Sequence, residues 1–131
     1  MIIDASALLA VVLAEPDAAR YARAIAGTAS RRMPCVTWFE AAMRIDFAGD
    51  AYAVRRFNDF LNEFNIELIS VTPAHAREAR RARQLYGKPH HPAGLNFGDC
   101  IVYGVARVEN EPLLFKGNDF VHTDIEPALK D

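Results

Sequence analysis

The sequence has few of the features that mark specialised classes of protein. Only two of its 131 residues are cysteines, and both Cys35 and Cys100 lie in apolar stretches without the spacing of metal ligands. We therefore expect two buried free thiols in a reducing compartment. No apolar run approaches the ~18 residues that cross a membrane, and the opening residues include no basic segment of a secretion signal. These absences predict a cytoplasmic protein with no membrane partner.

The chain also lacks a strong charge of either sign. Its formal net charge of -2 identifies no partner, and its composition of 51% hydrophobic and 24% charged residues is typical of soluble globular proteins. We find no internal repeat or linker, so one domain over residues 1–131 is expected. One segment is locally basic, because only Glu78 offsets a cluster of five cations: Arg77, Arg80, Arg81, Arg83 and Lys88.

Short apolar runs alternate with helical patterns along the whole chain. The pattern predicts strands at 2–3, 33–36, 66–71 and 112–115, and helices at 6–14, 17–26, 38–48, 53–64, 73–86 and 97–108. Strands that alternate with helices form parallel sheets covered by helices on both faces. We therefore predict an α/β fold of three layers, α/β/α, around a central, mainly parallel, twisted sheet.

Four acidic residues each follow a predicted strand or lie in the first turn of the helix after one: Asp4, Glu40, Asp99 and Asp119. The carboxyl ends of parallel strands share one edge of a sheet, where ligands bind. Four carboxylates brought together there would repel one another, and a divalent cation would relieve that repulsion. The sequence therefore predicts an acidic metal site at this edge.

Each of these carboxylates also has a structural explanation. Asp4 could cap the next helix, Asp99 could favour the positive end of a helix, and Asp119 could be a turn residue. Glu40 could complete a capping box with Thr37. Singly, these explanations are sufficient, but the shared edge favours a common site. Asp4 is hardest to explain otherwise, because a charge that ends a central apolar strand is costly unless it is paired.

Polar and basic residues near this edge are further candidates. Ser6 and Asn118 could orient a carboxylate or a metal-bound water, although a helix cap and a turn residue are equally good interpretations. The adjacent histidines at 90 and 91 lack the spacing of a zinc site. Contact with the phosphates of a nucleic acid is the alternative to simple solvation for seven basic residues: Arg77, Arg80, Arg81, Arg83, Lys88, His90 and His91.

Three stretches carry a family resemblance: residues 1–7 (MIIDASA), 94–100 (GLNFGDC) and 113–120 (LLFKGNDF). Together with Glu40 they resemble PIN-domain ribonucleases, specifically the VapC-type toxins of type II toxin–antitoxin pairs, over essentially the whole chain. The resemblance implies a PIN-like fold and metal-binding acids at the four positions above, with Ser6 as a supporting hydroxyl. For the fourth acid we prefer Asp119 to Asp124, because Asp119 follows the predicted strand more closely.

The resemblance also implies a reaction and its partners. The expected activity is Mg²⁺- or Mn²⁺-dependent hydrolysis of RNA, with Asp4 and Asp99 holding the cation and the other two acids completing its shell. The expected partners are a cognate VapB-type antitoxin and a second copy of the chain in a homodimer. Apolar helix faces such as Leu8-Leu9-Val12 or Trp38-Phe39-Met43 could serve either contact.

Two other functions remain open at this point. An aspartyl-phosphate enzyme would use Asp4 as its nucleophile, but a haloacid-dehalogenase-like hydrolase would have a second aspartate where Ser6 stands. A non-catalytic RNA- or partner-binding module with a PIN-like fold is the second alternative. The intact set of acids argues against that module, and binding of Mn²⁺ would distinguish it from a nuclease.

Overall fold

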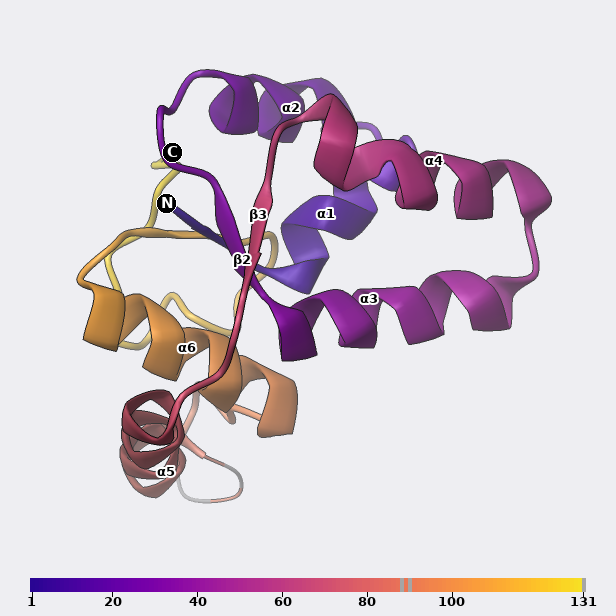
Figure 1. Ribbon diagram of the computed structural model, residues 1–131. Helices are drawn as coiled ribbons and strands as arrows, with labels where there is room; N and C mark the ends of the chain where they lie inside the picture. Colours follow the sequence, from indigo (N-terminus) through magenta and orange to yellow (C-terminus); the bar gives the residue numbers. More distant parts are fainter. Residues whose placement is uncertain (88, 90, 131) are drawn as a thin grey trace.

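A four-stranded parallel sheet forms the centre of the computed structural model, which describes residues 1–87, 89 and 91–130. The strands lie in the order β3-β2-β1-β4, so the chain starts near the middle of the sheet and later adds strands on both sides (Figure 1). All pairs are parallel, as predicted. The strands are short: β1 (Ile2–Ile3), β2 (Arg32–Pro34), β3 (Glu67–Ile69) and β4 (Leu113–Leu114).

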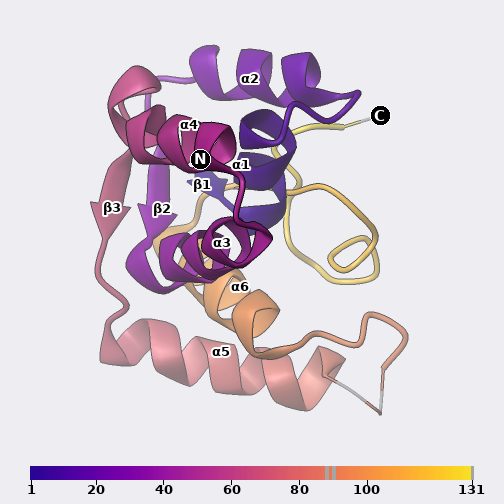
Figure 2. The ribbon, with the colours of Figure 1, turned by 90° about the vertical axis from the view of Figure 1, so that its right-hand side faces the viewer.

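Helices cover both faces of this sheet. In Figure 1, α1, α3 and α4 lie on one side of β2 and β3 and most of α6 lies on the other, while Figure 2 shows the strands running from α2 at the top towards α5 at the bottom. The alternation of strands and helices follows the prediction, and the three layers are those of an α/β/α fold. The helices of the described part of the chain are α1 (Ala5–Val12), α2 (Ala18–Ala26), α3 (Cys35–Ala48), α4 (Ala51–Glu63), α5 (Pro73–Tyr86) and α6 (Phe97–Glu109).

The two residues of β1 contribute to two different cores. Ile3 packs with Met33 and Leu114 in a cluster that includes α1, α2, α3 and α4. Ile2 packs with Leu113 in a second cluster, formed by α5, α6 and the C-terminal segment. Neighbouring residues of a strand point to opposite faces of the sheet, and both isoleucines are completely buried. β1 therefore joins the two halves of the molecule.

Helices α5 and α6 cross at very short range at Gly104. A Cβ atom on this glycine would lie 2.6 Å from the carbonyl oxygen of His75 and 2.8 Å from the backbone nitrogen of Ala79. Ala79 and Ala82 are buried on the facing side of α5. Because no side chain separates the two backbones, α5 holds α6 closely and so fixes the helix that carries Asp99.

An ion-pair network ties together the opposite, amino-terminal edge of the sheet. The Met1 ammonium pairs with Glu111, which also pairs with Arg32 at the start of β2. Arg32 reaches Glu109 at 2.9 Å, and the Glu109 carboxylate also lies 2.9 Å from Nε2 of the buried His75. The network links β1, β2, α5 and α6 at the end of the sheet away from the acids.

Two predictions about α3 are wrong. Thr37 and Glu40 do not form a capping box, because the helix begins at Cys35 and its N-cap is Pro34, without a side-chain cap bond. β2 ends at this proline, and Thr37 lies inside the helix, where its buried hydroxyl oxygen has no hydrogen-bond partner in the described structure. Cys35 is exposed rather than buried, since it starts the helix, whereas Cys100 is buried as predicted; both are free thiols.

The length and polarity of the helices decide whether any of them could cross a membrane. Among those described, none combines the length and the apolar character that would let it cross a lipid bilayer.

Candidate active site

Asp4 ends β1 and caps α1. Its backbone N–H donates a 2.9 Å hydrogen bond to the carbonyl of Leu114, so the residue is still tied to β4. Its carboxylate accepts hydrogen bonds from the backbone nitrogen of Ser6 at 3.1 Å and from the Ser6 hydroxyl at 2.5 Å. Burial raises the pKa of Asp4, the bonds from Ser6 lower it in part, and the charge of Asp119 raises it further. Both the predicted cap and the predicted buried charge are therefore present.

Asp99 lies in the first turn of α6 and forms a capping box with Asn96. The Asp99 N–H donates to Asn96 Oδ1 at 2.9 Å, and the Asn96 N–H donates to Asp99 Oδ2 at 3.2 Å. Burial raises the pKa of Asp99 to about 7 against one opposing hydrogen bond from Asn96, and the charges of three other acids add to the rise: Asp119, Asp4 and Glu40. The helix cap thus orients a carboxylate whose pKa is raised in part by the charges of all the other predicted ligands.

Glu40 reaches the same place from α3. Burial and the charge of Asp4 raise its pKa, while Arg44, one turn later, lowers it. Its carboxyl group lies directly against the backbone of Gly98, where an added Cβ would stand 2.8 Å from Glu40 Cδ and closer still to Oε2. Sequence reasoning did not single out Gly98. Its only signal was a glycine inside a predicted helix, which costs helix stability and therefore calls for an explanation.

Asp119 supplies the fourth charge from the loop after β4. It is exposed, and its charge contributes to the raised pKa of both Asp4 and Asp99. Asp124, the other candidate, has a different role. It accepts a 2.5 Å hydrogen bond from the buried Tyr103 hydroxyl and lies 3.8 Å from Arg107. Asp124 therefore anchors the C-terminal segment to α6, whereas Asp119 interacts with the acid cluster.

Asp4, Glu40, Asp99 and Asp119 come from segments at the carboxyl ends of the strands, and the charge of at least one other acid of this set contributes to the raised pKa of Asp4, Glu40 and Asp99. Their donor set consists only of carboxylate oxygens, the ligands preferred by hard cations such as Mg²⁺ and Mn²⁺. Within residues 1–87, 89 and 91–130, however, no three His, Cys, Asp or Glu side chains are close enough to hold a metal ion as they stand. The chemistry of the cluster fits a divalent cation, and its side chains would have to draw together around one.

Comparison with known proteins agrees with this geometry. A family model described as "PIN domain" matches residues 1–126. Ribonuclease VapC30 of Mycobacterium tuberculosis (strain ATCC 25618 / H37Rv) is 42% identical over 125 residues, which are 95% of each chain. Ribonuclease VapC28 of the same strain is 42% identical over 130 residues, or 98% of each chain. The chain belongs to the VapC-type PIN-domain ribonucleases.

Solved structures show the same fold. The crystal structure of VapC20 from Mycobacterium tuberculosis, described as a sarcin–ricin loop cleaving toxin, superposes with a TM-score of 0.74 at 12% identity and covers 95% of both chains. A chain of a toxin–antitoxin complex from Klebsiella pneumoniae gives a TM-score of 0.69 at 18% identity, covering 94% of this chain and 92% of the other. The predicted PIN-like α/β fold is therefore confirmed.

In this VapC-type domain, the Ser6 hydroxyl connects Asp4 to the segment that leads to Asp119. The Ser6 hydroxyl, which donates to Asp4, accepts a 2.9 Å hydrogen bond from the backbone N–H of Lys116. The Lys116 ammonium pairs with Glu15 at 2.8 Å and with Asp17 at 2.9 Å. The loop that carries Asn118 and Asp119 is therefore fixed both to Asp4 and to the α1–α2 connection. Asn118 itself is exposed on that loop.

The predicted basic residues of the VapC-type chain are mostly on α5. Arg77, Arg80, Arg81 and Arg83 are all exposed, and Arg81 is paired with Glu78 at 2.9 Å. The Arg83 side chain lies over Gly87. Burial and the charge of Asp99 raise the pKa of the Cys100 thiol, and the charge of Arg83 lowers it. Arg83 on α5 is therefore close enough to α6 for its charge to influence a residue in the first turn of that helix.

Three residues of the basic set follow α5 in the sequence. Lys88 and His90 lie outside the described residues. His91 Nδ1 accepts a 3.0 Å hydrogen bond from the Ala93 N–H, and its ring meets the Tyr86 ring edge-on at 5.0 Å. These contacts explain how His91 is held in the loop. Contact of the basic set with RNA stays a prediction.

Proposed function

We propose that this VapC-type ribonuclease is a Mg²⁺- or Mn²⁺-dependent endoribonuclease toxin whose cation is held by Asp4, Glu40, Asp99 and Asp119. The observation that carries the proposal is the convergence of the segments that bear these acids: the Glu40 carboxyl lies against the backbone of Gly98, next to Asp99, and the Ser6 hydroxyl that donates to Asp4 also holds the backbone of Lys116 in the segment before Asp119. Asp4, Glu40 and Asp99 each have a raised pKa, and in each case another acid of the set contributes. Buried carboxylates that destabilise one another are stabilised by a divalent cation.

The residues of the site divide into two pairs. Asp4 and Asp99 are nearly buried and are oriented by hydrogen bonds from Ser6 and Asn96, so they suit the fixed ligands of the cation. Glu40 is half-buried and Asp119 is exposed, so these side chains can move to complete the shell directly or through water. A bound cation would lower the pKa of a coordinated water and offset charge on the phosphate.

The substrate that we propose is RNA. VapC30 and VapC28, 42% identical to this chain, are named ribonucleases, and VapC20 is described as cleaving the sarcin–ricin loop. The exposed arginines of α5 add a positive surface that would attract phosphates. Hydrolysis would leave a 5′-phosphate and a 3′-hydroxyl, the ends implied by the family resemblance.

Calorimetric titration with MnCl₂, followed by RNA cleavage with analysis of the new ends, tests this function. Wild type and the control Asp59→Asn, on the exposed face of α4, should bind Mn²⁺ and cleave RNA. Asp99→Asn should bind Mn²⁺ at least tenfold more weakly and lose cleavage. A purified Asp99→Asn variant with the wild-type, metal-dependent rate would contradict the site. Wild type that neither binds Mn²⁺ nor cleaves any RNA would favour the non-catalytic module instead.

A VapB-type antitoxin is the protein partner that we propose. The likeness to a chain of a toxin–antitoxin complex supports a partner of this kind. A groove of about 260 Å³ between α1, α2 and α4 is lined mainly by small and apolar side chains, including Val11, Ala18, Ala22 and Phe60, and also by Arg56 and Glu63. Such a groove suits the apolar face of a helix. Ala22→Arg should weaken copurification with the product of the adjacent reading frame, whereas Ala26→Arg, exposed on the same helix, should not.

The proposed homodimer would use a different surface. Leu8, Leu9 and Val12 are buried in the core, so they serve packing. Phe39 and Met43 are 57% and 52% exposed, one turn apart on α3, and they offer an apolar face to a second copy. Sedimentation velocity at micromolar concentration should show a dimer that Met43→Glu converts to monomer. A wild-type monomer under these conditions would contradict the dimer.

A further inference from the structure

A cleft of about 440 Å³ opens between α1, α3 and the loop after β4, and the proposed chemistry does not use it. Its volume is within the roughly 300–1,000 Å³ range of sites for small molecules and cofactors. Ser6 belongs to its lining, and the Ser6 hydroxyl donates the 2.5 Å hydrogen bond to Asp4. This α1–α3 cleft therefore begins beside one of the proposed metal ligands and is large enough for one nucleotide.

Most of the lining of the α1–α3 cleft is apolar. Leu9 and Leu13 come from α1 and its C-terminal cap, and Ile45 and Ala48 come from α3. Leu9 and Ile45 are buried and belong to the core, whereas Leu13 is 44% exposed. Sites for small organic ligands combine such an apolar wall with a few polar groups that fix the orientation of the ligand. The wall suits the flat apolar face of a nucleoside.

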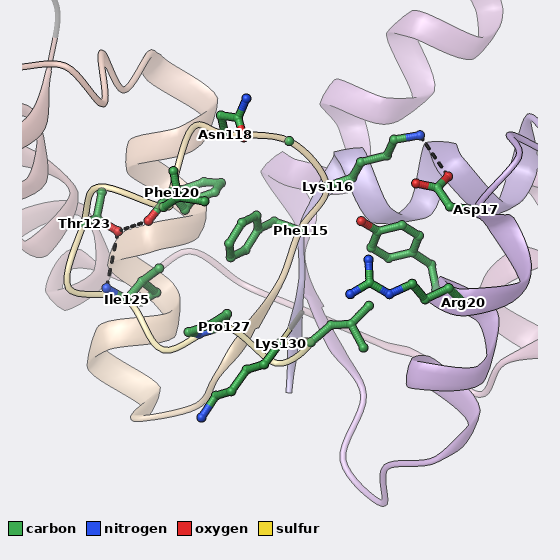
Figure 3. A pocket seen from close by; sticks show the side chains of 14 residues that line it. Asp17, Arg20, Phe115, Lys116, Asn118, Phe120, Thr123, Ile125, Pro127 and Lys130 are labelled. Carbon is green, nitrogen blue, oxygen red and sulfur yellow. Dashed lines mark hydrogen bonds and ion pairs between the residues drawn. The ribbon is translucent and has the colours of Figure 1, made fainter.

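The charged side chains of the lining are Glu15, Arg44 and Lys116. The Lys116 ammonium is held by Glu15 at 2.8 Å and by Asp17 at 2.9 Å, and the second of these pairs is drawn in Figure 3. Lys116 and Glu15 therefore neutralise each other. Arg44 is exposed, and among the described carboxylates it influences Glu40 through its charge but forms a salt bridge with none. Arg44 is thus in a position to bind an incoming anion.

Arg44 stands at the edge of the acid cluster. It follows Glu40 by one turn of α3, so the two side chains lie on the same side of the helix. The Glu40 carboxyl lies against Gly98, one residue before Asp99. RNA that is cleaved at these acids must bring its phosphates to this edge, and a guanidinium group recognises phosphate oxygens through two parallel hydrogen bonds.

We propose that the α1–α3 cleft binds one nucleotide of the RNA substrate beside the acid cluster, with a phosphate at Arg44 and the attached nucleoside against Leu13 and the apolar wall. The proposal rests on the proposed function, which it extends to a binding site for the substrate. An apolar segment of a partner protein or of a second copy would also fit the wall. The guanidinium group beside Glu40 favours a ligand that carries a phosphate.

Fluorescence anisotropy with labelled ten-nucleotide oligouridine and oligoadenosine tests this site in EDTA, where no metal-dependent cleavage occurs. Arg44→Gln and Leu13→Ser should each weaken binding at least fivefold, and Arg44→Lys should restore most of it. The slope of log Kd against log salt should fall by about 0.7 in Arg44→Gln and stay unchanged in Arg44→Lys. The matched controls are Arg55→Gln, exposed on α4, and Val108→Ser, 42% exposed on α6; both should change Kd less than twofold.

Calorimetry with MnCl₂ separates binding of a phosphate from a role at the metal site. Arg44→Gln should bind Mn²⁺ at least as tightly as wild type, because it loses a positive charge near Glu40. Its KM for RNA cleavage should nevertheless rise at least fivefold. An arginine that served only to offset the charge of Glu40 would leave the Kd of the oligonucleotides in EDTA unchanged when it is replaced.

Three outcomes would overturn the site. These are a wild-type Kd in Arg44→Gln, no binding of either oligonucleotide by wild type, or cleft variants that lose only the antitoxin or the dimer. Thermal unfolding is measured alongside. If Leu13→Ser is unfolded, Arg44→Gln and photo-crosslinking of a 4-thiouridine oligonucleotide to wild type decide: crosslinks within residues 9–13 or 44–48 support the cleft, and crosslinks confined to α5 reject it. Cleavage with Mn²⁺ is scored separately, so failure of the nuclease is distinguished from failure of the binding site.

Discussion

The hydroxyl of Ser6 donates a 2.5 Å hydrogen bond to the carboxylate of Asp4. The same oxygen accepts the backbone N–H of Lys116, so one side chain joins the ends of β1 and β4, which carry two of the four acids. In metal sites, partners of this kind orient the ligand and tune its affinity for the cation.

Ser6→Ala should therefore weaken Mn²⁺ binding and RNA cleavage by roughly 10–100-fold. Removal of the hydroxyl takes away a bond that lowers the pKa of Asp4, so the carboxylate becomes harder to ionise. Calorimetry and initial rates measure the effect. Ser70→Ala, exposed after β3, is the control and should behave as wild type. Unchanged Mn²⁺ affinity in Ser6→Ala would refute this role.

The metal-free protein should lose stability as the pH rises from about 4 to about 7. The folded-state pKa of Asp99 is about 7, against 3.8 for an ordinary aspartate in water, so the folded protein binds this proton more tightly than the unfolded chain. Stability therefore falls across this interval, by at most about 4 kcal/mol for this residue. Thermal unfolding in EDTA at pH 5 and pH 8 measures the change.

Asp99→Asn should flatten that pH dependence and raise the melting temperature of the metal-free protein at pH 8. The amide has no charge to desolvate, so it avoids the cost that burial imposes on the carboxylate. Asp59→Asn provides the comparison and should keep the wild-type slope. A pH profile of Asp99→Asn as steep as that of wild type would show that other groups cause it.

Two alanine substitutions in α6 should separate activity from stability. In Gly98→Ala the three atoms nearest to the new Cβ all belong to the end of the Glu40 side chain, which can move away. Cleavage should fall at least tenfold, while the fold is kept or gains up to about 1 kcal/mol of helix propensity. In Gly104→Ala the Cβ meets the backbone of α5. Because that backbone cannot move without shifting the whole helix, the free energy of unfolding should fall by about 1–3 kcal/mol.

Urea unfolding and cleavage rates of the two glycine variants provide the measurement. Each variant is the control for the other, because both exchange glycine for alanine in the same helix. Wild-type cleavage by Gly98→Ala would mean that the position of Glu40 against α6 has no catalytic consequence.

The two aspartates after β4 should respond differently to the same change. Asp119→Asn should abolish metal-dependent cleavage with little effect on unfolding. Asp124→Asn should keep Mn²⁺ affinity and lose about 1 kcal/mol of stability, because the amide is a weaker acceptor for the Tyr103 hydroxyl and the site is partly exposed. If Asp124→Asn lost Mn²⁺ binding and Asp119→Asn kept it, Asp124 rather than Asp119 would be the fourth acid of the metal site.

Much of the fold could be predicted from the sequence because its signals are local. Pro73 predicts the start of α5, and Asn96 as an N-cap predicts the start of α6; both helices begin as expected. Thr37 and Glu40 have the spacing of a capping box, yet Pro34 ends β2 and the helix starts early. Spacing alone does not distinguish a cap from an interior turn when the preceding strand is only three residues long.

The candidate site was partly predictable for a related reason. The positions of Asp4, Glu40, Asp99 and Asp119 follow from the topology, since parallel strands end at one edge. The contact between Glu40 and Gly98 depends on how α3 crosses α6, and the cleft at Arg44 depends on how α1 and α3 meet the loop after β4. Such features come from packing between distant segments, and local sequence patterns do not predict that packing.

The division of β1 between two cores has a consequence for variation in length. A residue inserted between Ile2 and Ile3 would turn one of these side chains away from its core and would rotate Asp4 out of the acid cluster. The surface turn at 27–31, by contrast, carries no acid of the cluster and precedes β2. Natural relatives should therefore differ in length at such turns, while the spacing from Ile2 to Asp4 stays invariant.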